Sequence, residues 1–193
     1  MTIKHGTREA WLEEAMSELS PHFVKLNRPL PARIRVTCGF TSGGTRKRRG
    51  GKTLVGECWD STRSGDATFE LMVSPVEDDP VRVLGILAHE LCHAAVGLKA
   101  GHGPAFRSLA RGMELEGPLT ATTVGLAFET FTSSMRQRLG DYPHCKLDTS
   151  TRQVQTTRML RCTCACGYTV RLSQKWLTVG LPLCPLHGPM AQS

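Results

Sequence analysis

Apolar positions recur with helical spacing in three segments of the chain. The first segment covers residues 7–20, where Thr7 is a suitable N-cap and Pro21 marks the expected end. The second begins at Asp79-Pro80, a capping residue followed by a proline that fits the first turn, and should run to about Gly97. A third helix is predicted from Pro104, whereas residues 120–140 give a weaker pattern, part helix and part loop.

Three strands are predicted between the first two helices, the first from the alternation of Ile34, Val36, Cys38 and Phe40. They are residues 32–40, 53–60 and 67–75. Residues 41–52, between the first two strands, form a glycine-rich, basic loop. We expect a small, mostly antiparallel sheet, and with the helices an α+β fold.

The polar, turn-rich residues 141–157 are the best candidate for a linker. This divides the chain into a domain of residues 1–140 and a small module of residues 158–193.

Composition narrows the function classes. Apolar residues make up 40% of the 193, enough for a core, and no apolar run reaches the roughly 18 to 20 residues of a membrane helix. The N-terminus carries charge throughout and has no apolar signal core. We therefore expect a soluble, cytoplasmic protein with no membrane partner, and its formal charge of +7 favours polyanions, nucleic acid first.

The eight cysteines are unevenly distributed. Four lie in the C-terminal fifth beside a histidine, which is typical of metal ligands rather than of disulfides. The dispersed ones are expected to be small buried or half-buried side chains; they are Cys38, Cys58, Cys92 and Cys145.

The second predicted helix contains the sequence HELCH. Residues four apart lie on one helix face, so His89 and His93 can bind one ion, and zinc suits imidazole. Glu90 then lies beside the metal, where it can act as general base. This is the H-E-x-x-H pattern of zinc metallopeptidases.

The third ligand has several candidates. A histidine six residues after His93 would complete one known pattern, but that residue is Lys99. Glu114 or Glu116 lies at a separation suited to a glutamate ligand from the next helix. We favour His102, because the flanking glycines allow the chain to turn back toward the histidine pair.

HELCH, the eight residues after it and then HGPAF resemble the active site of the SprT-like domain. This is the zinc metallopeptidase domain of bacterial SprT proteins and of Spartan, a DNA-dependent protease, and the layout is similar to forms from bacteriophages and actinobacteria. The resemblance covers roughly residues 5–187. It implies a zincin-like domain followed by a zinc-ribbon-like piece, with His89, His93 and His102 as ligands, Glu90 as base, and DNA-associated or DNA-crosslinked proteins as substrates.

The strand at residues 67–73 directly precedes the zinc helix. In zinc peptidases of this architecture an edge strand binds the substrate chain in extended form, and we expect this strand to do so. The alternative is an ordinary core strand.

A second metal site is predicted near the C-terminus. Cys184 and His187 follow Cys166 at a distance typical of two ligand pairs, which favours a structural zinc. Resemblance to relatives with a cysteine just before Gly-Tyr supports Cys166 as a ligand. Cys164 is its favoured partner, with Cys162 as the alternate.

Two basic regions are candidates for nucleic-acid binding. The stronger is the loop with Arg46, Lys47, Arg48, Arg49 and Lys52, whose flanking glycines would let it follow phosphates. In the C-terminal module Arg158, Arg161, Arg171 and Lys175 surround Trp176, which could stack on a base. For Trp176 we favour the other interpretation, a core residue.

The sequence thus predicts a zinc-dependent endopeptidase with one catalytic and one structural Zn²⁺, a protein substrate and DNA as a candidate second partner. The alternative is a nucleic-acid-binding zinc protein with a non-proteolytic accessory role.

Overall fold

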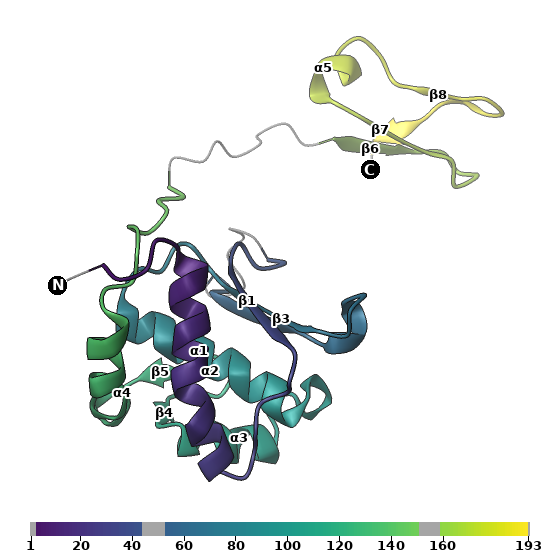
Figure 1. Ribbon diagram of the computed structural model, residues 1–193. Helices are drawn as coiled ribbons and strands as arrows, with labels where there is room; N and C mark the ends of the chain where they lie inside the picture. The colour runs from purple at the N-terminus through teal and green to yellow at the C-terminus, as the bar shows by residue number, and fades with distance from the viewer. Residues whose placement is uncertain (1–2, 44–52, 151–158, 193) are drawn as a thin grey trace. The chain divides into compact units, whose positions relative to one another are not determined.

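The computed structural model describes residues 3–43, 53–150 and 159–192 (Figure 1). The chain divides into two compact units, Met1–Thr149 and Ser150–Ser193. Both combine helices with small sheets, in agreement with the expected α+β class. In the described part of the chain, no helix is long and apolar enough to cross a bilayer.

The first unit contains a three-stranded sheet, a two-stranded one and four α-helices among its described residues. In chain order its elements are α1 (Arg8–Lys25), β1 (Ile34–Cys38), β2 (Gly56–Trp59), the 3-10 turn η1 (Ser61–Arg63), β3 (Phe69–Val73), α2 (Pro80–Val96), η2 (Leu98–Ala100), α3 (Pro104–Gly112), β4 (Leu115–Glu116), β5 (Thr123–Val124) and α4 (Leu126–Leu139).

Helix α1 begins where the sequence predicts and ends later. Thr7 caps it, because its Oγ1 accepts a hydrogen bond from the Ala10 N–H at 3.2 Å. The predicted end at Pro21 is wrong: the helix continues to Lys25 with Pro21 inside it. Phe23, one half-turn later, is fully buried. Burying a Phe side chain stabilises by about 1.5–3 kcal/mol, which offsets much of the ~3 kcal/mol cost of an internal proline.

The large sheet has the order β1-β3-β2, so β3 is its central strand. β3 pairs parallel with β1 and antiparallel with β2. The expectation of a mostly antiparallel sheet is therefore wrong for this sheet, which is mixed. β2 and β3, joined by a short connection, pair antiparallel, while β1 crosses to the other side of β3 and packs under α1.

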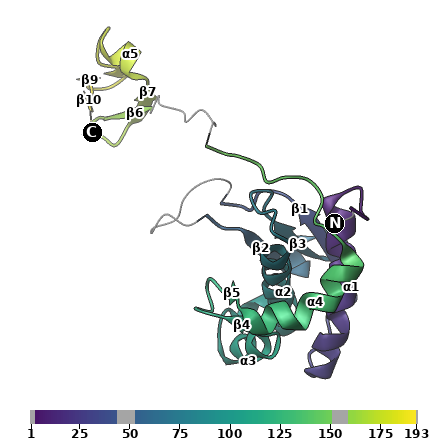
Figure 2. The ribbon, with the colours of Figure 1, turned by 90° about the vertical axis from the view of Figure 1, so that its left-hand side faces the viewer.

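The helices cover one face of this sheet. Alternation along the strands directs Val36, Leu71 and Val73 to the same face, and all three are buried in the core. α1 packs against β1, and α2 packs against β2 and β3 (Figures 1 and 2). The sheet thus holds α2, which carries the HELCH sequence, against the edge strand β2.

Helix α2 has the predicted bounds. The Asp79 carboxylate accepts a hydrogen bond from the Arg82 N–H at 2.8 Å, and Pro80 occupies the first turn. The helix ends at Gly97, whose φ of 80° is rarely adopted by other residues. Its buried apolar residues include the predicted Val83, Leu84, Leu87, Leu91 and Ala94.

The chain after α4 stays bound to the first unit. Arg8 is buried and donates hydrogen bonds to the carbonyls of Pro143 (3.2 Å) and Cys145 (2.6 Å). The Leu147 N–H donates to the Pro75 carbonyl at 2.8 Å. The described residues 141–149 of the expected linker therefore belong to this unit. Cys145 is exposed, contrary to expectation, because only its carbonyl faces Arg8.

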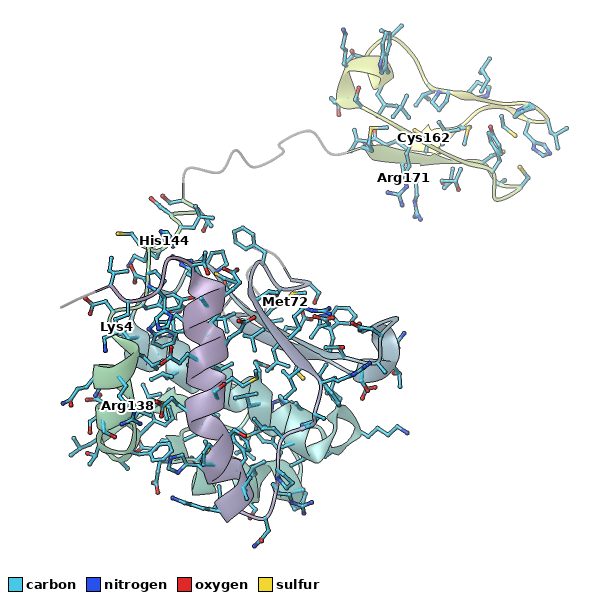
Figure 3. The ribbon with its side chains drawn as sticks, in the orientation of Figure 1. Lys4, Met72, Arg138, His144, Cys162 and Arg171 are labelled. Carbon is cyan, nitrogen blue, oxygen red and sulfur yellow. The ribbon has the colours of Figure 1, made fainter. Side chains whose placement is uncertain are left out.

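The N-terminal segment is held at the C-terminal end of α4. Lys4 Nζ donates to the Arg138 carbonyl at 2.6 Å, and the Arg138 guanidinium binds Glu18 of α1 (Figure 3).

The second unit has a very small core. Its elements are β6 (Leu160–Thr163), β7 (Thr169–Leu172), α5 (Gln174–Leu177), β8 (Leu183–Cys184), β9 (Gly188–Pro189) and β10 (Ala191–Gln192), with sheets β10-β6-β7 and β8-β9. The buried apolar cluster described here consists of Cys162, Cys184 and Met190, with a few half-buried neighbours. A core of this size supplies little hydrophobic stabilisation, so such a unit usually needs a cross-link or a metal.

Candidate metal centres

Three histidines from one helix and the following turn meet at one point. His89 and His93 lie one turn apart on α2, as their spacing predicts. His102 follows η2 and Gly101, whose φ of 49° lets the chain reverse. His102 Nε2 lies 3.2 Å from His93 Nε2 and 3.4 Å from His89 Nε2.

These distances fit a tetrahedral metal. Zinc–nitrogen bonds of about 2.05 Å place two ligands of a tetrahedron about 3.3 Å apart. The ligand nitrogens of the three histidines all lie within 4.8 Å of one another. The group can therefore hold one ion such as zinc and leave a fourth position for water or substrate.

One aromatic ring supports all three imidazoles. Phe106 of α3 is fully buried, and its ring centroid lies 4.4 Å from that of His93 and 4.9 Å from those of His89 and His102. Burial and the neighbouring imidazoles lower the pKa of His89 to about 3 and of His93 to about 4. Both rings are therefore neutral at pH 7, the form that binds metals.

Thr122 orients the first histidine. Its Oγ1 lies 2.9 Å from His89 Nδ1, so with Nε2 directed at a metal the Nδ1–H donates to this hydroxyl. Thr122 reaches this place because β5 crosses α2 at Gly85, where Val124 Cγ1 fills the space that a Cβ would need.

Glu90 lies beside the histidines and is 6% exposed. Burial, together with the charge of Glu57, raises the pKa of Glu90 to about 8. A nearby dication would oppose this shift, because it favours the carboxylate. The site thus holds a carboxyl group able both to take up and to release a proton near neutral pH.

The backbone of β2 lies directly against this carboxyl group. A Cβ at Gly56 would lie 2.7 Å from Ile86 Cγ2 and closer still to Glu90 Oε1. Only glycine leaves room for the Glu90 side chain at this position.

Two cavities flank the histidines. One, of about 340 Å³, includes Glu57, Cys58, His93, Leu98 and His102 in its lining. The other, of about 400 Å³, lies on the side of Ile86 and extends to residues 118–122. Both include His89, Glu90 and part of β2, so a cleft runs along β2 past the histidines.

The strand that borders this cleft is β2. The expectation that residues 67–73 form the substrate-binding edge is wrong, because β3 is paired on both sides. Val55 accepts a hydrogen bond from the Ser74 N–H at 2.8 Å, so its main chain faces β3. By alternation, the N–H and C=O groups of Gly56 and Cys58 face the open edge.

The other candidate ligands lie elsewhere. Neither Glu114 nor Glu116 belongs to the ligand group at the histidines. Glu114 is exposed, and the Glu116 carboxylate lies against Gly125.

A second group of ligands forms in the C-terminal unit. The ligand atoms of Cys164, Cys166, Cys184 and His187 lie within 4.8 Å of one another. Cys166 Sγ lies 3.7 Å from Cys184 Sγ, and His187 Nδ1 lies 3.6 Å from the sulfurs of Cys164 and Cys184. Tetrahedral zinc with bonds of about 2.3 Å to sulfur and 2.05 Å to nitrogen requires about 3.8 and 3.6 Å. The four residues therefore fit one zinc ion.

The alternate ligand Cys162 has a different place. It is fully buried in the small core and does not belong to the ligand group.

The backbone N–H of Leu186 and then the His187 side chain lower the pKa of Cys184 to about 6, which favours the thiolate that a metal needs.

No known relative emerges. Comparisons with protein-family models, curated proteins and solved structures find no match. The geometry of the two ligand groups therefore carries the functional argument, together with the motif in the sequence.

The strongest nucleic-acid candidates lie outside the described residues. These are Arg46, Lys47, Arg48, Arg49 and Lys52 of the basic loop, and also Arg158. In the second unit Arg171 is exposed and its side chain extends away from the β6–β7 pair (Figure 3). Trp176 is 56% exposed with Lys175 Nζ 5.3 Å from its ring centroid, so the interpretation of Trp176 as a core residue is wrong.

No pattern in the sequence points to several of the residues that shape the site. Thr122 stands in the threonine-rich run Thr120-Ala121-Thr122-Thr123, and Gly56 is one of 19 glycines. Their roles arise only when β2 and β5 come together at α2. Ile86 is different: it precedes Glu90 by one helical turn, a spacing from which its position could have been inferred.

Proposed function

We propose that this protein is a zinc-dependent endopeptidase of the SprT-like kind, with His89, His93 and His102 as metal ligands and Glu90 as the general base. The observation that carries the proposal is the spacing of the three Nε2 atoms next to the buried Glu90 carboxyl group. A purely structural site has no need of such a carboxyl group. We further propose that the fold is zincin-like and that the C-terminal unit is a zinc ribbon.

Zinc held by the three histidines would supply Lewis-acid chemistry, polarising a carbonyl group and lowering the pKa of water. Glu90 takes a proton from the attacking water and passes it to the leaving amine nitrogen. Thr122 keeps the His89 ring in the tautomer and orientation that the ligand role requires.

The open edge of β2 gives the substrate a place to bind. A peptide in extended form can hydrogen-bond to the main chain of Gly56 and Cys58, as a strand added to a sheet. Main-chain recognition of this kind favours unfolded or extended segments of proteins. DNA-associated or DNA-crosslinked proteins enter the proposal only through the sequence resemblance.

The test is proteolysis of an unfolded protein by the wild type and by Glu90→Gln, with zinc content measured on both. We expect the variant to keep its zinc and to lose cleavage by a factor of about 10² or more. Cleavage by zinc-loaded Glu90→Gln at the wild-type rate would refute the mechanism.

One observation favours a second candidate function, a nucleic-acid-binding accessory protein. Trp176 is exposed beside Lys175, an arrangement that suits stacking on an unpaired base next to a phosphate. Salt-dependent DNA binding that Trp176→Ala weakens, without proteolysis of any substrate, would favour this candidate.

A further inference from the structure

One side of the β8–β9 hairpin carries exposed apolar side chains. Cys184 of β8 is buried in the small core, so by alternation its neighbour Leu183 points to the opposite side of the hairpin, where it is 67% exposed. Pro189 of β9 pairs with Leu183 and is exposed beside it, because cross-strand partners share a side. The outer side of the hairpin is therefore apolar, whereas the outer positions of antiparallel strands are commonly polar.

The apolar surface continues along the chain before and after Leu183. The Met190 N–H donates a hydrogen bond to the Pro182 carbonyl at 3.0 Å, so the pairing of the hairpin continues one residue before β8. Leu181 is exposed two residues before Leu183 and thus lies on the same outer side. Leu186, in the turn of the hairpin, is 81% exposed. We call these four exposed residues the hairpin face: Leu181, Leu183, Leu186 and Pro189.

Metal ligands hold the hairpin face in place. Cys184 and His187 belong to the ligand group of the second unit and lie on either side of Leu186 along the chain. The turn that carries Leu186 is therefore anchored at two points. A single exposed leucine is ordinary on a protein surface, but adjoining apolar side chains on an anchored element mark an interaction site.

The charge of the second unit indicates which kind of partner fits this face. No aspartate or glutamate follows Asp148 in the sequence. The described part of the unit contains three cationic side chains, those of Arg161, Arg171 and Lys175. Without carboxylates to offset them, these cations give the unit a positive potential, which attracts anionic partners and repels a second copy of the unit.

A protein segment satisfies both the apolar face and the positive charge. Single-stranded nucleic acid matches the charge, but its bases stack on aromatic rings, which leucine and proline do not offer. Insertion into an anionic bilayer needs projecting side chains, whereas Leu183 and Pro189 lie along the side of the hairpin. A segment that combines leucine-like side chains with carboxylates can cover the side and the turn together.

We propose that the hairpin face binds an acidic segment of a partner protein through leucine-like side chains. The apolar contact supplies affinity, and the positive charge of the unit selects against basic segments. The inference holds whether or not the first unit cleaves peptides, since no residue of the first unit takes part.

Peptide binding tests the proposal directly. The probe is a fluorescein-labelled peptide of four Glu-Leu repeats, compared by fluorescence anisotropy with Lys-Leu and Glu-Ser repeats of the same length. The zinc-loaded full chain with Glu90→Gln is used, so that cleavage by the first unit does not consume the probe. We expect the Glu-Leu peptide to bind about tenfold or more tightly than either of the others. Equal affinity for the three peptides, or no binding of the Glu-Leu peptide, would overturn the proposal.

Two substitutions assign the binding to the hairpin face. Leu183→Ser and Leu186→Ser each remove one exposed leucine, and each should weaken binding of the Glu-Leu peptide about tenfold. Both variants should keep the second zinc, because neither residue is a ligand. The matched control is Leu126→Ser, at a position of α4 that is 79% exposed, and it should leave the affinity unchanged. A loss of the same size in the control, or no loss in either hairpin variant, would contradict the assignment.

Other occupants of the hairpin face give different results. Phosphatidylserine vesicles that bind the wild type but not Leu183→Ser, with no binding of the Glu-Leu peptide, would assign the face to a membrane surface. Binding of oligo(dT) that is lost in Leu183→Ser, again without binding of the peptide, would assign it to single-stranded nucleic acid. Either result would overturn the proposal.

Discussion

Replacing Gly56 with alanine adds one methyl group at the closest contact between β2 and the proposed catalytic carboxyl group. The new Cβ would lie 2.7 Å from Ile86 Cγ2, whereas ordinary contacts begin at 3.4 Å, so these groups must separate by roughly 0.7 Å. The Glu90 carboxyl group lies closer still and must move further. We expect the free energy of unfolding to fall by about 1–3 kcal/mol.

The effect on catalysis should be larger than the effect on stability. A displacement of about 1 Å in a catalytic group costs on the order of 10² in rate. We therefore expect kcat/KM for an unfolded substrate to fall about 10²-fold in Gly56→Ala, at unchanged zinc content, since the three histidines are untouched.

The matched control is Gly39→Ala, where a Cβ meets nothing within 4 Å. It introduces the same change in the unfolded chain and no close contact in the fold. If Gly56→Ala and Gly39→Ala cleave at the same rate with equal zinc content, the placement of Glu90 against β2 is wrong.

Three further predictions concern the two ligand groups. Thr122→Val should weaken zinc binding at the histidines about 10- to 100-fold in a chelator competition, because the hydroxyl orients His89. Thr122→Ser keeps the hydroxyl and should bind zinc almost as the wild type does. Equal losses of zinc affinity in both variants would contradict this role. Burial lowers the pKa of all three ligand histidines, to about 3 for His89 and about 4 for His93, so protons should compete poorly for these rings. This site should therefore retain zinc at pH 5.5 and lose it at lower pH. Release already near pH 6.5 in dialysed samples would argue against the burial. Cys184→Ser should remove the second zinc and unfold the C-terminal unit, which its NMR spectrum would report. Cys162→Ala should keep that zinc. Loss of zinc in Cys162→Ala would restore Cys162 as a ligand.

Much of the helical structure could be predicted because its signals are local. Thr7 and Asp79 cap the helices that follow them, and Gly97 ends α2. The same holds for the histidine pair, since helical spacing alone brings His89 and His93 together. His102 needed one further inference, the reversal allowed by Gly101, and the structure has that reversal.

The errors arise where contacts between distant segments decide the structure. Pro21 ends a helix by local rules, but burial of Phe23 carries α1 past it. The parallel pairing of β1 with β3 cannot be read from either strand alone, and it determines which strand lies at the open edge. For the same reason the sequence pointed to β3 as the substrate strand, where the structure points to β2.

The second unit shows a different limit on what can be predicted from the sequence. Its core is too small to bury every large apolar side chain, so Trp176 is exposed although its residue type favours burial. The choice between Cys162 and Cys164 likewise depended on the β6–β7 pairing, which directs Cys162 into the core.

Zinc content per chain tests the central claim most directly. It should be measured on the wild type and on the His89→Ala/His93→Ala double variant, each after removal of loosely bound metal. We predict two zinc ions per wild-type chain and one in the double variant. One zinc in both would leave the cysteine site alone and contradict the assignment of the three histidines as a metal centre.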